Sequence, residues 1–130
     1  MTISTTGNAA KFGDTTANFD GPRGSSNDLN DRAVFNNAAT IEFLAISHEG
    51  NTLDFGDRTV AAKLPSGFSN GTDERGMFAG GTVAPLNDTI DYVTISTPGN
   101  AIDFGNMLSA TAAGYGYSNS PTQNWPYENS

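Results

Sequence analysis

The chain has 130 residues, no cysteine and a formal net charge of −8, from 6 Lys and Arg against 14 Asp and Glu. The lack of cysteine excludes disulfides and thiolate metal sites, and the few scattered cations argue against binding to nucleic acid or to an anionic membrane. A single domain is expected at this length, and 15 Gly and 6 Pro with only 36% apolar residues are typical of a loop-rich β protein.

A repeated motif organises this domain. The pattern Ile-Ser-x-x-Gly-Asn-x-x-x-Phe-Gly-Asp/Asn occurs three times, and its glycines Gly7, Gly50 and Gly99 are 43 and 49 residues apart. Periods of this size are typical of propellers, solenoids and arrays. We therefore expect one repeat domain, residues 1–130, with units at about 1–40, 41–89 and 90–130.

Short strands are expected in each unit, because β-branched and aromatic residues alternate there and no window combines helical periodicity with caps. In chain order the expected strands are residues 32–36, 40–47, 52–55, 75–81, 89–96 and 101–104, with a last strand of each unit in 59–68 and 108–117. The six extra residues of the longer period fall between residues 79 and 88, as expected for a hairpin loop. Four strands in about 50 residues predict an all-β fold of three antiparallel, blade-like (kelch/propeller-like) units.

One stretch resembles a known repeat. Residues 75–106 contain Arg-Gly-Met-Phe-Ala-Gly-Gly and Asn-Asp-Thr-Ile-Asp-Tyr-Val-Thr-Ile-Ser-Thr-Pro-Gly-Asn-Ala-Ile-Asp-Phe-Gly-Asn. This sequence resembles the kelch-like repeat of bacteriophage virion structural proteins and tail fibres, notably those of marine cyanophages. The resemblance implies antiparallel β blades and a structural role in a particle, and it carries over no catalytic residue. The chain departs from it at Asn36-Asn37, where the later unit has Gly80-Gly81, and at residues 124–127, where the Arg-Gly-Met-Phe string would fall.

The apolar positions of the repeat are the predicted core, because a residue that recurs at a fixed spacing most often serves packing. They are Phe12, Phe35, Ile46, Phe55, Phe78, Ile95 and Phe104.

Each end of the chain matches half of a unit, so we expect oligomerisation to complete the repeat. A propeller closes with about four to eight blades, and three units predict a ring or an open filament of several chains. The alternative is a sheet or sandwich that never forms a propeller. The candidate subunit interface comprises Ile3, Tyr115, Tyr117, Trp125 and Tyr127. Packing within a unit and glycan binding are the alternative roles of its aromatic residues.

No catalytic, cofactor-binding or metal-ligating residue is predicted. His48 is the only histidine and lies in an expected turn, where a solvated side chain is the simplest interpretation. The Asn/Asp-rich residues 27–31 lack the central Gly and the distal Glu of a calcium loop, and we interpret them as a polar turn. The Asn-x-Thr sites at Asn70 and Asn87 are interpreted as turns, since no export signal is visible.

The resemblance to the phage repeat, together with the small and acidic chain, implies a non-enzymatic virion structural protein that needs no cofactor. It would belong to a tail fibre or to a decoration of the capsid or tail, assembled in the host cytoplasm with itself and with other virion proteins. No apolar run approaches the length of a membrane span. The alternative is a self-assembling filament subunit or a glycan-binding propeller module, whose partner would be a host-surface glycan.

Overall fold

The computed structural model describes residues 7–26, 30–71, 74–82, 85–112 and 114–116, and every regular element in these ranges is a strand. The predicted all-β class is therefore confirmed. The strands are β1 (Arg23–Ser26), β2 (Arg32–Asn37), β3 (Thr40–Ala45), β4 (Leu53–Asp57), β5 (Ser66–Ser69), β6 (Arg75–Ala79), β7 (Thr89–Thr94) and β8 (Ile102–Asn106).

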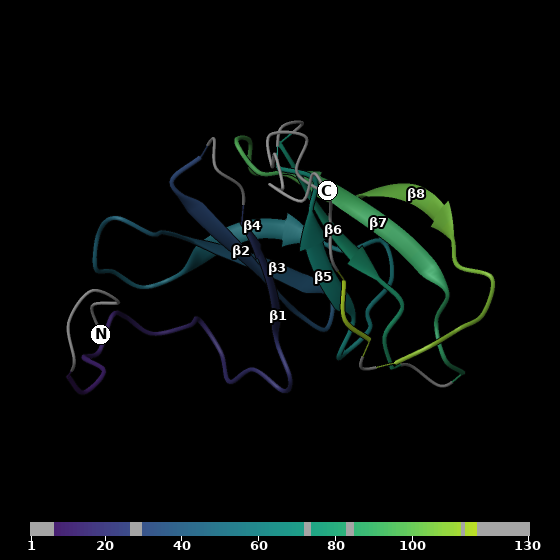
Figure 1. Cartoon of the computed structure of the whole chain (residues 1–130), viewed down its shortest axis with the longest axis horizontal. Helices are drawn as coiled ribbons and strands as arrows, with labels where there is room; N and C mark the ends of the chain where they lie inside the picture. The colour runs from purple at the N-terminus through teal and green to yellow at the C-terminus, as the bar shows by residue number, and fades with distance from the viewer. Residues whose placement is uncertain (1–6, 27–29, 72–73, 83–84, 113, 117–130) are drawn as a thin grey trace, which may run out of the picture.

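The strands form two antiparallel sheets, ordered β1-β2-β3-β4 and β5-β6-β7-β8. Figure 1 shows β1 and β5 near the centre of the molecule and β8 at its outer edge. The first strands of the two sheets are in contact: Ser69 Oγ donates a hydrogen bond to the Ser26 carbonyl oxygen at 2.5 Å. A Cβ at Gly67 would lie only 2.9 Å from the Gly24 oxygen, so glycine allows this close approach.

The described residues form two blade-like sheets, where the repeat predicts three units, and they do not form a closed propeller. The strand expected in residues 59–68, as the last one to follow the strand at 52–55, is β5, and it opens the second sheet by pairing with β6. The connection from β5 to β6 is shorter than that from β4 to β5, and sequential strands with short connections usually pair. The sheets therefore span residues 23–57 and 66–106, out of phase with the units 1–40, 41–89 and 90–130.

The two sheets are close structural copies. Ala38 and Ala39 join β2 to β3, whereas the connection from β6 to β7 runs from Gly80 to Asp88, and the six extra residues lie there as predicted. Each third strand shifts register at the same place, between Ile41 and Glu42 and between Ile90 and Asp91. The sequence repeat thus corresponds to a repeated pattern of strand pairing, and the register shift in the third strand of each sheet is repeated with it.

The core lies between the two sheets. Three of its six buried apolar side chains come from each sheet: Val34, Ile41 and Phe55 from the first, and Phe78, Val93 and Ile95 from the second. Burial of one such side chain stabilises the fold by about 1.5–3 kcal/mol. The core is therefore an interface between consecutive repeats.

Only part of the predicted core lies in this interface. Phe55, Phe78 and Ile95 are buried in it, and Phe35 is half-buried. The core assignment is wrong for the other three residues, which are exposed: Phe12 by 39%, Ile46 by 48% and Phe104 by 55%. Ile46 and Phe104 correspond in the repeat to the buried Ile95 and Phe55, but they lie on the two sheet faces that have no neighbouring sheet in the described structure.

Candidate functional site

The Phe-Gly-Asp segment of the first motif binds the Gly-Asn turn of the second. The backbone N–H of Gly50 donates to the Phe12 carbonyl oxygen at 2.9 Å, and the N–H of Thr52 donates to the Asp14 oxygen at 2.9 Å. In return the Asp14 N–H donates to the Asn51 Oδ1 at 2.9 Å. The contact uses backbone groups and one Asn side chain, so the repeat itself specifies it.

The second motif makes two of these three hydrogen bonds with the third motif. The Asp57 N–H donates to the Asn100 Oδ1 at 3.0 Å, and the Ala101 N–H donates to the Asp57 carbonyl oxygen at 2.8 Å. Asp57, Asn100 and Ala101 are the repeat equivalents of Asp14, Asn51 and Thr52. One docking geometry therefore links three successive motifs.

The glycine of each Phe-Gly-Asp segment makes this contact sterically feasible. A Cβ at Gly13 would lie 1.9 Å from the Gly50 oxygen, and one at Gly56 would lie 2.4 Å from the Gly99 oxygen. Gly56 also has a φ of 147°, which side chains rarely adopt. A side chain at either position would force the two motifs apart.

The third strand of each sheet carries a buried carboxylate. This carboxylate accepts hydrogen bonds from a threonine that follows the Phe-Gly-Asp segment. Glu42 on β3 accepts from the Thr16 N–H at 3.1 Å and from the hydroxyls of Thr16 and Thr52. Asp91 on β7 accepts from the Thr59 N–H at 3.0 Å and from its hydroxyl at 2.9 Å. Glu42 and Asp91 occupy the same repeat position, as do Thr16 and Thr59.

At the second of these contacts the carboxylate also pairs with a buried cation. Arg58 Nε lies 3.1 and 3.2 Å from the two Asp91 oxygens, and both side chains have 0% exposure. Burial lowers the pKa of the Arg58 guanidinium, and the Asp91 charge and hydrogen bonds offset part of that shift. The guanidinium also lies 5.8 Å from the centre of the Phe78 ring. The pair therefore ties the end of β4 to the middle of the second sheet.

Glu42 has no such cation and depends on neutral donors. Its burial would raise the carboxyl pKa, but the hydrogen bonds from Thr16 and Thr52 outweigh burial and leave the pKa below its ordinary value. The side chain is therefore charged at neutral pH. It fixes the N-terminal segment on the first sheet.

Sequence reasoning did not assign a role to these carboxylates. A signal existed, since Asp91 alternates with Val93 and Ile95 and so shares the face that is buried. An acidic residue on an apolar strand face, repeated at the same position of another unit, indicates a buried polar partner.

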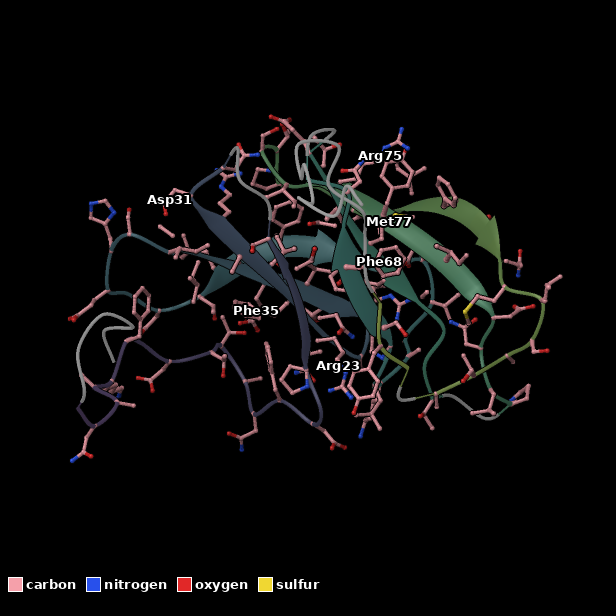
Figure 2. The ribbon with its side chains drawn as sticks, viewed as in Figure 1. Arg23, Asp31, Phe35, Phe68, Arg75 and Met77 are labelled. Carbon is pink, nitrogen blue, oxygen red and sulfur yellow. The ribbon has the colours of Figure 1, made fainter. Side chains whose placement is uncertain are left out.

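An apolar cavity of about 220 Å³ lies between the N-terminal segment and the first sheet. Its apolar lining is formed by Phe12, Phe19, Pro22, Phe35 and Leu44. Figure 2 shows Phe35 beside β2 in the first sheet. In the second sheet the equivalent of Phe35 is the fully buried Phe78, which packs against the first sheet. The cavity on the first sheet thus occupies the position that corresponds to the buried core on the second sheet.

Of the predicted interface residues, Tyr115 alone lies in the described part of the chain, where it is 81% exposed. The flanking glycines contact β5: a Cβ at Gly114 would lie 2.4 Å from Ser66 Oγ, and one at Gly116 would lie 2.1 Å from Phe68 Cδ1. Phe68 faces Met77 across the β5–β6 pair (Figure 2). Ile3, Tyr117, Trp125 and Tyr127 lie outside the described residues.

The described polar residues that were weighed as catalytic or metal-binding candidates lie on the surface. His48 is exposed, and its Nδ1 lies 2.6 Å from Ser47 Oγ and 3.9 Å from an oxygen of Asp31. Hydrogen bonding from Ser47 lowers the pKa of Asp31, which precedes β2. Residues 27–29 of the Asn/Asp-rich segment lie outside the described ranges, and those ranges contain no group of three or more His, Cys, Asp or Glu placed to hold a metal. In the part of the chain that the structure describes, no helix has the length and apolar character needed to cross a membrane.

The chain matches no protein-family model, and no curated protein matches its sequence. The docking of successive motifs is the structural feature that bears most directly on function.

Proposed function

We propose that this protein is a non-enzymatic structural protein of a bacteriophage particle, in a tail fibre or in a decoration of the capsid or tail, that acts by assembly with itself or with other virion proteins. The observation that carries the proposal is the docking of each Phe-Gly-Asp segment on the next Gly-Asn turn. The likeness of residues 75–106 to the kelch-like repeat of phage proteins supports the choice of a virion.

The physical character of the contact suits a structural role. Its hydrogen bonds, close glycine approaches and buried carboxylates hold one unit against the next in a single geometry, and the apolar core lies at the same boundary. A contact between equivalent units that recurs along a chain can also recur between chains. Assembly would then follow from the same chemistry that folds the chain.

Mass spectrometry of purified particles from the source that encodes the gene tests the virion role. We expect the protein in a fixed ratio to the capsid protein after density-gradient purification. Its presence in the lysate but not in purified particles would contradict the proposal. Portal, capsid and tail genes beside its own gene would give independent support.

The cavity on the first sheet favours a second candidate, a receptor-facing binding module. Three aromatic rings, Phe12, Phe19 and Phe35, line a space of about 220 Å³. Apolar pockets with aromatic walls are typical ligand sites. Retention on a glycan array that is lost in a Phe19→Ala variant would support this candidate, and no retention of the wild type would exclude glycans as its ligand.

A further inference from the structure

The third motif also has a docking segment, Phe104-Gly105-Asn106, which lies in β8 at the end of the second sheet. Gly105 has a φ of 143°, close to the 147° of Gly56. No atom of the described residues lies within 4 Å of where a Cβ on Gly105 would be, whereas a Cβ on Gly56 would lie 2.4 Å from the Gly99 oxygen. Phe104 is 55% exposed, whereas the equivalent Phe55 is 3% exposed. The segment therefore has the docking conformation without a docked turn.

Two further apolar residues on the outer face of the second sheet show the same difference. Met77 and Ile90 are only partly buried, whereas their equivalents Val34 and Ile41 have 0% exposure beneath the second sheet. β8 is also an edge strand, and β4, the equivalent edge of the first sheet, is covered by the Gly99–Ala101 turn. An apolar face beside an open edge is a surface prone to pairing with another chain.

The complementary half of the contact, the first Gly-Asn turn, also has no docked segment among the residues that the structure describes. Gly7-Asn8-Ala9 is the equivalent of Gly50-Asn51-Thr52 and of Gly99-Asn100-Ala101, the two turns that are occupied. Residues 7–9 are exposed, and within the described part of the chain no atom lies within 4 Å of a Cβ placed on Gly7. The turn has the groups that bind a Phe-Gly-Asp or Phe-Gly-Asn segment.

The two free halves of one copy cannot meet. Phe12, Asp14 and Thr16 are hydrogen-bonded to the first sheet, at Gly50, Thr52 and Glu42. Figure 1 shows this N-terminal segment at one end of the molecule and β8 at the other. A second copy is therefore the occupant whose chemistry matches.

We propose that the edge of β8 binds the Gly7–Ala9 turn of a second copy. The Asn106 N–H would donate to the Asn8 Oδ1, the Ala9 N–H would donate to the Asn106 carbonyl oxygen, and Phe104 would be covered. The inference rests on the self-assembly in the proposed function and specifies its interface. Because the two surfaces differ, the contact is head-to-tail, and it gives a ring if the rotation closes and a filament if it does not.

Size-exclusion chromatography with light scattering on the full chain tests the contact with a pair of matched variants. Phe104→Asp places a charge in the interface, and we expect it to raise the dissociation constant about tenfold or more. Ile102→Asp is the control: Ile102 lies on the same strand at 56% exposure, and its equivalent Leu53 stays 60% exposed beside a docked turn. The control should assemble as the wild type does.

A mixing experiment tests the head-to-tail geometry. Gly7→Pro with Asn8→Ala removes a donor and an acceptor from the turn, and both residues are exposed. We expect this variant and Phe104→Asp each to run as a monomer of about 13.6 kDa. Mixed together, they should form a dimer and nothing larger, since one intact edge and one intact turn remain.

The outcomes separate the interface from the proposed function. A wild type that stays monomeric at high concentration overturns self-assembly and this inference together. Assembly that survives in both the Phe104→Asp and the turn variant overturns the interface and leaves self-assembly standing. An equal loss of assembly in Phe104→Asp and Ile102→Asp also overturns the interface, because a substitution outside the proposed contact would then weaken assembly as much as one inside it.

Discussion

Replacing Arg58 by Met should be among the most destabilising single changes in this protein. The substitution keeps an apolar stem of similar length but removes the cation that pairs with Asp91, and both side chains are fully buried. Loss of one partner of a buried ion pair costs about 3–5 kcal/mol, because the remaining charge stays in a medium of low polarity. The hydrogen bonds from Thr59 to Asp91 remain and hold the loss within that range.

Urea denaturation followed by circular dichroism, at one protein concentration for all variants, measures the free energy of unfolding. A loss of about 3–5 kcal/mol corresponds to a fall in Tm on the order of 10–20 °C for a domain of this size. Lys63→Met is the control, because the Lys63–Asp20 pair is 52% and 73% exposed and screened by solvent, so its loss should leave the free energy of unfolding nearly unchanged.

A double variant identifies the cause. Arg58→Met with Asp91→Asn leaves no buried charge and keeps an oxygen acceptor for Thr59, so it should be more stable than Arg58→Met alone by about 2 kcal/mol. The reasoning is refuted if the double variant is no more stable than the single one, or if Arg58→Met costs no more than Lys63→Met.

Three further predictions concern the contacts between repeats. Phe55→Ala should cost about 3–5 kcal/mol of unfolding free energy and Phe104→Ala about 1 kcal/mol in the dissociated chain, since their exposures are 3% and 55%; equal losses in urea titrations would contradict the assigned core. Gly56→Ala should lower Tm more than Gly105→Ala, because both have positive φ but only the Cβ at Gly56 would meet a neighbouring turn, and the reverse order would count against the docking contact. The depressed pKa of Glu42 means that the unfolded chain binds more protons, so this residue's contribution is present above the unfolded pKa and is lost as pH falls through the lower folded pKa. Glu42→Gln should therefore flatten the decline of Tm on acidification below about pH 4.5, and an unchanged slope would show that the carboxylate is not coupled to folding.

Several elements were readable from the sequence because they depend on local chemistry. The strands β3 and β7 follow from their β-branched and aromatic residues, and β2 and β6 follow from the Arg-x-x-Phe string that both units share. The longer β6–β7 connection follows from the place of the six extra residues. The short strand β5 was assigned to the end of a unit, because Ser66-Gly-Phe-Ser69 has almost no apolar pattern to show which strand it pairs with.

The candidate site was less accessible to sequence reasoning, since its groups come from different units. Nothing local indicates that Thr16 reaches Glu42 or that Arg58 reaches Asp91, residues that are separated by 26 and 33 positions. Their pairing depends on how the motifs dock, and that docking joins a Phe-Gly-Asp segment to an Asn of the next motif, 37 or 43 positions away in the chain.

The sequence by itself determined the repeat, the β class and the identity of the residues at each repeated position. The tertiary structure alone decided which copies of these residues are buried. Ile95 and Ile46, or Phe55 and Phe104, are equivalent in the repeat, yet one of each pair is in the core and the other is exposed. The reason is physical: burial depends on whether a neighbouring unit covers a given face, and a pattern that is the same in every unit cannot record that difference.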